Sequence, residues 1–220
     1  MARIGLWKML ATLAAFGLAL PLMGCSDNGH LGNTLNLSGQ VYTADGERGT
    51  TATLLPFTGN MAITSNLAGV TGAITNGQMS FEAGRPGNLG PLNVIFGGAT
   101  INPSSARGTA LEMFGGNTQI VRSYHSEDPR TDTFTMVMVL YVFVDREVTI
   151  SQDAETEVWG RFSETTNAFN ITLREGWNAV HYKMVITNLN LVGTEPSHQT
   201  HTFSLGDPGN LRWLMGDFSL

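Results

Sequence analysis

Short segments that alternate apolar and polar residues recur between residues 35 and 215, and turns rich in glycine separate them. Alternation puts every second side chain on the same face of a strand, which is typical of a sheet with one buried face. No segment in this region has a convincing helical period, and no unit of fixed length repeats. We therefore predict an all-β fold, an antiparallel β-sandwich built as one large unit or two small ones.

The strongest strand signal runs from Thr133 to Asp145, where apolar residues lie on both faces and β-branched and aromatic types are frequent. This pattern indicates a central strand that is covered on both sides. Residues 145–147 are predicted to reverse the chain tightly. Residues 148–159 are then expected to return beside the strand as a long hairpin.

Shorter signals predict further strands. Residues 35–42 alternate well enough to form the first one. The pair Asn76-Gly77 accommodates the positive backbone angles of a two-residue turn, so residues 70–75 and 78–81 are expected to pair antiparallel. Residues 89–96 are expected to form another strand.

Turn residues gather between Gly97 and Asn117 and indicate a possible domain boundary. We predict an N-terminal β-rich region over residues 35–105 and a C-terminal β-sandwich region over residues 106–220. One continuous domain over residues 35–220 fits the length equally well.

The N-terminal end has the order of a secretory leader. Arg3 and Lys8 supply positive charge, and an uncharged apolar run then leads to the quartet Leu22-Met23-Gly24-Cys25. This quartet resembles the lipobox of bacterial lipoprotein precursors, in which the cysteine is lipidated and becomes the new N-terminus. The resemblance implies a signal helix over residues 1–24 that is cleaved, followed by a lipidated tether over residues 25–34.

Two other interpretations of the leader, an ordinary secretory signal and a membrane anchor, fit less well. The uncharged run of residues 9–24 is shorter than the roughly 20 apolar residues that span a bilayer, and Pro21 would interrupt a helix near its end. The resemblance implies a bacterial cell-envelope protein held in a membrane by lipid, such as palmitate, on Cys25. Ser26 and Asp27 resemble the enteric pattern that permits transport to the outer membrane.

Cys25 is the only cysteine of the chain. If it carries lipid, the mature chain has neither a free thiol nor a disulfide, and its apolar core alone must stabilise the fold. Removal of residues 1–24 leaves ten basic residues against 18 acidic ones, a net charge of −8. This charge argues against a nucleic-acid partner, and the lipid on Cys25 is the one membrane contact that the sequence predicts.

Two segments of the mature chain resemble known proteins. Residues 37–42 and the later segment 72–81 are similar to carboxypeptidase-regulatory-like and prealbumin-type β-sandwich modules. Residues 173–180, in which Trp177 follows a glycine turn, resemble segments of uncharacterised bacterial surface lipoproteins. The first likeness implies a β-sandwich fold, and neither likeness implies a function. Trp177 is expected to be a core plug at the entrance of a strand.

Sequence signatures of catalysis are missing: there is no Gly-x-Ser-x-Gly, no phosphate-binding loop and no His-Glu-x-x-His. We therefore predict that the protein is not an enzyme and holds no cofactor, while a triad assembled only in three dimensions stays open. His198 and His201 form the one cluster that resembles a metal site, but residues three apart on a strand point to opposite faces. A polar loop before a strand at Thr202 is expected there, without a metal.

Glu127, Asp128 and Asp132 lie in a charged segment predicted to be a loop over residues 125–132. Their carboxylates could offer oxygens to calcium, but the Asp-x-Asp-x-Asp-Gly pattern of calcium loops is missing. We expect solvated turn carboxylates.

Asp153, Glu155 and Glu157 alternate along a predicted strand and therefore share one of its faces. That face is expected to be the solvent side, where the charges limit edge-to-edge association with other chains.

The cell-envelope location implied by the lipobox resemblance and the missing catalytic signatures lead to the first hypothesis. It is a non-enzymatic envelope lipoprotein that binds another envelope protein or a carbohydrate. The alternative is a structural subunit of an envelope or fimbrial assembly, whose strand edges pair with neighbouring chains. A hydrolase or metal-handling lipoprotein that uses His198 and His201 is a third hypothesis.

Overall fold

The computed structural model describes residues 29–45, 53–128, 132–188, 197–206 and 211–216. In this part strands form nearly all of the regular structure, beside one short 3₁₀ helix, η1 (Leu92–Val94). The all-β prediction is therefore confirmed. The predicted signal helix and Cys25 lie outside the described residues. Within the described part, no helix has the length and apolar character needed to cross a membrane.

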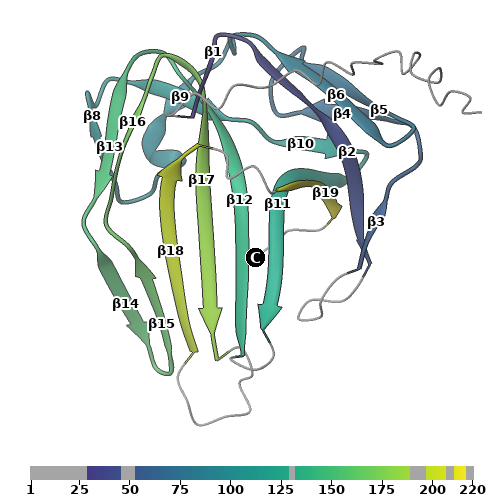
Figure 1. The fold of residues 1–220 in the computed structure, drawn as a ribbon. Helices are drawn as coiled ribbons and strands as arrows, with labels where there is room; N and C mark the ends of the chain where they lie inside the picture. The colour runs from purple at the N-terminus through teal and green to yellow at the C-terminus, as the bar shows by residue number, and fades with distance from the viewer. Residues whose placement is uncertain (1–28, 46–52, 129–131, 189–196, 207–210, 217–220) are drawn as a thin grey trace, which may run out of the picture.

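Figure 1 shows the arrangement of the strands. In chain order, the described strands are β1 (His30–Gly32), β2 (Leu35–Asp45), β3 (Thr53–Pro56), β4 (Met61–Ser65), β5 (Thr71–Thr75), β6 (Gln78–Ala83), β7 (Gly90–Pro91), β8 (Thr100–Asn102), β9 (Arg107–Ala110), β10 (Met113–Gly115), β11 (Thr118–Asp128), β12 (Thr133–Val144), β13 (Val148–Gln152), β14 (Glu155–Trp159), β15 (Phe162–Thr166), β16 (Phe169–Leu173), β17 (Gly176–Thr187), β18 (Ser197–Leu205) and β19 (Arg212–Gly216). Sixteen of these strands form one large sheet, and β8, β13 and β16 form a second, small sheet.

Seven strands of the large sheet close on themselves into a barrel. Their order is β10-β4-β5-β6-β2-β19-β11, and β10 also pairs with β11, which completes the ring. Strand β19 lies between β2 and β11, so residues from both ends of the fold are neighbours in the ring. The inward-facing apolar side chains form the barrel core, in which Leu35, Leu37 and Ile63 are at most 3% exposed.

Trp213 on β19 fills part of the barrel core. Its ring stacks on Tyr141 with the centroids 6.1 Å apart, and its indole N–H donates to the carbonyl of Ser38 at 3.1 Å. A Cβ at position 39 would lie only 2.9 Å from Cδ1 of this ring, and the backbone there has a φ of 148°. Both observations explain why Gly39 is a glycine.

Trp177 is the second residue of β17 and is fully buried. Its indole N–H donates to the carbonyl of Gly84 at 3.0 Å, and its ring meets Phe143 edge-on at 5.4 Å between centroids. The predicted core plug at a strand entrance is confirmed.

Strand β12 is a central strand that is covered on both sides over its C-terminal half, as predicted. Val139, Tyr141 and Phe143 face the barrel core, whereas Val142 and Val144 face a second core. This second core lies between β12 and β17 of the large sheet and the small sheet β16-β13-β8. One pair of strands therefore separates the two cores.

The long hairpin predicted for residues 133–159, with its turn at residues 145–147, is wrong. Strand β13 pairs with β16 and β8 in the small sheet, and β14 pairs with β15 in the large one. Asp145 explains the direction of the chain, because its N–H donates to the Arg107 carbonyl at 2.9 Å and its Oδ1 accepts the Arg107 N–H at 3.0 Å. Arg146 donates to the same carboxylate at 3.0 Å, which holds the pKa of Asp145 below its ordinary value. These contacts tie the turn at Asp145 to β9. The chain then enters the small sheet as β13 and does not return beside β12.

The strand predicted for residues 89–96 is also wrong. Only Gly90–Pro91 pairs with a neighbour, and η1 follows directly. Pro91 has no N–H for a longer ladder. The helical turn instead buries Leu92 and Phe96 in the second core, where they are 1% and 2% exposed.

The prediction of an antiparallel sandwich differs from the structure in three respects. Part of the large sheet closes into a barrel, so the fold is not a simple pair of open sheets. Two pairings are parallel, that of β2 with β19 and that of β15 with β18. The boundary predicted near residue 105 falls inside one hydrogen-bonded sheet, since β10 pairs with β4 and β19 pairs with β2.

Two local predictions are confirmed. Strand β2 begins at Leu35, and Leu35, Leu37 and Val41 are buried on its inner face. Strands β5 and β6 pair antiparallel across Asn76 and Gly77, whose φ angles of 49° and 77° suit a two-residue turn.

The tether predicted for residues 25–34 is wrong for its later residues. His30–Gly32 forms β1, which pairs antiparallel with the start of β17. The N–H of Ala179 also donates to the carbonyl of Gly29 at 2.7 Å. The folded part of the chain therefore begins earlier than the sequence indicates.

The variant Gly77→Ala tests the close backbone approach at the hairpin turn. Its Cβ would overlap the carbonyl oxygen of Phe57, and the residue would keep a φ of 77°. Gly116→Ala is the matched control, because Gly116 has a φ of 64° and a Cβ there meets nothing within 4 Å. We expect strain of about 1 kcal/mol in both variants. In chemical denaturation, Gly77→Ala should lower the free energy of unfolding by about 1–3 kcal/mol more than Gly116→Ala does. Equal losses would contradict the close approach.

Candidate functional site

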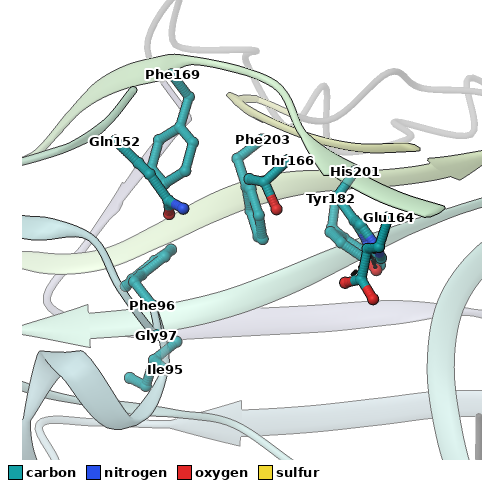
Figure 2. A pocket seen from close by; sticks show the side chains of 10 residues that line it. All are labelled: Ile95, Phe96, Gly97, Gln152, Glu164, Thr166, Phe169, Tyr182, His201 and Phe203. Carbon is teal, nitrogen blue, oxygen red and sulfur yellow. Dashed lines mark hydrogen bonds and ion pairs between the residues drawn. The ribbon is translucent and has the colours of Figure 1, made fainter. Parts of the chain in front are cut away.

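A cavity of about 180 Å³ opens at the edge of the second core, and we refer to it as the side pocket. Strands β15, β17 and β18 contribute to its lining, together with the ends of β13 and β16 and the residues that follow η1. Figure 2 shows the lining side chains. Pockets for drug-sized ligands begin near about 300 Å³, so this one suits a small group.

Four aromatic rings line the side pocket, and Phe203 on β18 lies at their centre. Its ring centroid is 5.0 Å from that of Phe169, 5.1 Å from that of Tyr182 and 6.2 Å from that of Phe96. Phe96 and Phe169 also belong to the second core, where they are 2% and 8% exposed. Core packing therefore holds the aromatic wall in place.

Three polar side chains lie together at the other end of the side pocket, as Figure 2 shows, and form a hydrogen-bonded chain across β17, β18 and β15. Tyr182 Oη lies 2.6 Å from His201 Nδ1, and His201 Nε2 lies 2.9 Å from Glu164 Oε1. Strand register explains the meeting: Tyr182 is opposite Phe203, and His201 is opposite Thr166, two residues after Glu164. Alternate residues share a face, so these side chains point to the same side of the sheet.

Tyr182 stays protonated at neutral pH. Burial and, to a lesser degree, the charge of Glu164 raise the pKa of Tyr182 to about 12. The phenol can therefore donate to His201 Nδ1, which leaves Nε2 to carry the imidazole proton and donate it to Glu164. The side-chain amide of Gln199 also lies 3.0 Å from His201 Nε2. With the amide oxygen facing the ring, Gln199 accepts a second hydrogen bond from the Nε2 proton. In this arrangement the negative charge of the pocket belongs to Glu164.

His198 lies on the opposite face of β18 from His201, as the three-residue spacing predicts. Its Nδ1 is 2.7 Å from Ser163 Oγ, and its Nε2 is 3.1 Å from Thr200 Oγ1. The two histidines do not converge. Among the residues that the structure describes, no group of three or more His, Cys, Asp or Glu side chains could hold a metal. The predicted polar loop is wrong, because residues 197–205 form β18 between β17 and β15.

The loop predicted over residues 125–132 begins later than expected. Strand β11 continues through Asp128, which pairs with Thr133 of β12. The side chains of Glu127 and Asp128 lie outside the described part. Asp132 has a φ of 48°, which suits a turn residue.

Strand β14 is exposed along its whole length, and Asp153, Glu155 and Glu157 are exposed as expected, but Asp153 precedes the strand and does not share its alternation. In the antiparallel pairing with β15, Glu157 lies directly opposite Glu164, and Glu155 lies opposite Thr166. Opposed residues share a face of the sheet. Glu155 and Glu157 therefore extend the side of the hairpin that lines the side pocket.

The sequence singled out His201 but missed its partners in the side pocket, Glu164, Tyr182 and Phe203. Residues 162–166 carry little local signal, because Phe162 is the one apolar residue among them, and Glu164 and Thr166 are placed on one face only once β15 is known to be a strand. No local pattern indicated that this strand pairs in parallel with β18. The meeting of Glu164 with His201 therefore could not be predicted.

No protein family, curated protein or solved structure compared with the chain matches it. Fold and site together define an all-β protein in which a seven-stranded barrel closes beside two long strands, β12 and β17, whose side chains enter both the barrel core and a second core. A pocket of aromatic rings and a carboxylate opens at the edge of that second core.

The variant Tyr182→Phe removes the donor to His201 and keeps the ring. His201 is 8% exposed, so its Nδ1 would lose its partner where little water can replace it. We expect the free energy of unfolding to fall by about 1–3 kcal/mol in chemical denaturation. Tyr42→Phe is the control, because the hydroxyl of half-buried Tyr42 makes no hydrogen bond within the described residues. Equal, small losses in the two variants would contradict the hydrogen-bonded chain.

Proposed function

We propose that this chain is a lipid-anchored protein of the bacterial cell envelope, on the outer membrane, that binds a ligand without catalysing a reaction. The leader and the lipobox-like quartet that ends at Cys25 support the anchor. Five residue steps separate Cys25 from His30, where β1 begins. Such a link spans at most about 18 Å. A lipid on Cys25 would therefore hold the fold next to the membrane.

The side pocket is the observation that supports a binding role. A small group of a carbohydrate or of another envelope protein could contact the ring of Phe203 and form hydrogen bonds with Gln152 and Glu164. General-base chemistry is less favoured. Tyr182 keeps its proton far above neutral pH, and hydrogen bonds occupy both ring nitrogens of His201.

A structural subunit of an envelope or fimbrial assembly is the alternative, and β14 favours it. All five residues of this strand are exposed, and within the described part it pairs only with β15. An open edge of this kind can accept a strand from a neighbouring chain. Glu155 and Glu157 oppose that association by charge, so we rank this function second.

A hydrolase or metal-handling lipoprotein is the weakest proposal. Two contacts between a serine and a histidine favour it, that of Ser163 with His198 at 2.7 Å and that of Ser204 with His181 at 3.0 Å. The other nitrogen of His198 meets the Thr200 hydroxyl, where a triad would place a carboxylate.

Replacement of Cys25 tests the anchor. In cells fed labelled palmitate, we expect Cys25→Ala to lose the label and to move from the membrane fraction to the soluble fraction. Ser26→Ala is the control and should keep both the label and the membrane location. A Cys25→Ala protein that keeps the label would contradict the anchor. Density separation of the membranes then distinguishes outer from inner membrane.

A further inference from the structure

The side pocket contains a negative charge that no lysine or arginine offsets. Glu164 contributes a carboxylate, and the described residues that line the cavity include neither basic type. The imidazole of His201 is the one basic group there, and its two nitrogens face Tyr182 and Glu164. This lining favours a cation or a neutral molecule over an anion.

A second carboxylate lies beside the first. Glu157 is opposite Glu164 in the β14–β15 pair, and like charges in directly opposed positions repel each other. Glu157 is exposed and has no ion-pair partner within the described residues. A positive charge between these two carboxylates would relieve the repulsion.

Aromatic rings complete the lining next to these carboxylates. A cationic nitrogen within about 6 Å of a ring centroid is attracted by the negative face of the ring. Phe169, Tyr182 and Phe203 supply such rings, with neighbouring centroids 5.0 and 5.1 Å apart. A hard metal ion would need further oxygen ligands where these rings stand. An alkylammonium group gains from both the rings and the carboxylates.

We propose that the side pocket binds an organic ammonium cation. Glu164 supplies charge within the lining, Glu157 lies opposite it on β14, and the rings of Phe169, Tyr182 and Phe203 line the cavity. A cavity of about 180 Å³ suits an ammonium head group, with the rest of the ligand in solvent. The inference rests on the proposed binding function and assigns the class of its ligand.

Choline and its uncharged carbon isostere, 3,3-dimethylbutan-1-ol, test the role of charge directly. The full-length protein in a non-ionic detergent is titrated with each compound, and amide chemical shifts give the affinity. We expect choline to bind at least about tenfold more tightly, with the largest shifts at Thr166 and Phe203. Equal affinities of the two compounds would overturn the inference, and this comparison needs no variant.

A titration with methyl glucoside separates the inference from the binding function on which it rests. Binding of the glycoside without binding of choline would overturn the ammonium class and leave the binding function in place. Failure of all three compounds to shift the residues of the side pocket would overturn both.

The variant Glu164→Gln keeps the shape of the side chain and removes its charge. We expect its affinity for choline to fall about tenfold, while its affinity for 3,3-dimethylbutan-1-ol stays unchanged. Glu82→Gln is the matched control, because Glu82 is exposed on β6 of the barrel, outside the lining of the side pocket. A Glu164→Gln protein that binds choline like the control would overturn the inference.

Discussion

The antiparallel pair of β12 and β17 is the constraint on which the rest of the fold depends. Its register runs without a break from Thr133 opposite Thr187 to Val144 opposite Gly176. Alternate side chains at the Val144 end enter the barrel core and the second core. The same backbone ladder therefore forms a wall of both cores, and opening it would expose the apolar side chains of each.

The same alternation determines where the side pocket lies. On β17, Trp177 and Ala179 enter the barrel core, whereas Val180 enters the second core. Tyr182, the next residue on the face of Val180, lies where the second core meets polar side chains. Core packing thus holds the aromatic wall of the side pocket, and under the proposed function this wall is in place before a ligand binds. Such preorganisation lowers the entropy that binding must offset.

Local patterns predicted the features that depend on local physics. Two-sided apolar character identified residues 133–145 as a central strand, and the backbone freedom of Asn76-Gly77 identified a hairpin turn. A glycine turn before Trp177 marked a core plug. Pairing between distant strands has no such local signal. The closed barrel, the parallel insertion of β19 and the contact of Glu164 with His201 all depend on distant pairings, and the sequence alone did not reveal them.

Native-state hydrogen exchange of the full-length protein is the most direct test of the shared wall. The slowest amides of β2 and β6 in the barrel and of β13 and β16 in the small sheet should match those of β12 and β17. We predict the same free energy of opening and the same dependence on denaturant for all six strands. Exchange of the barrel amides through an opening of clearly lower free energy, with β12, β17 and the small sheet still protected, would contradict the shared wall.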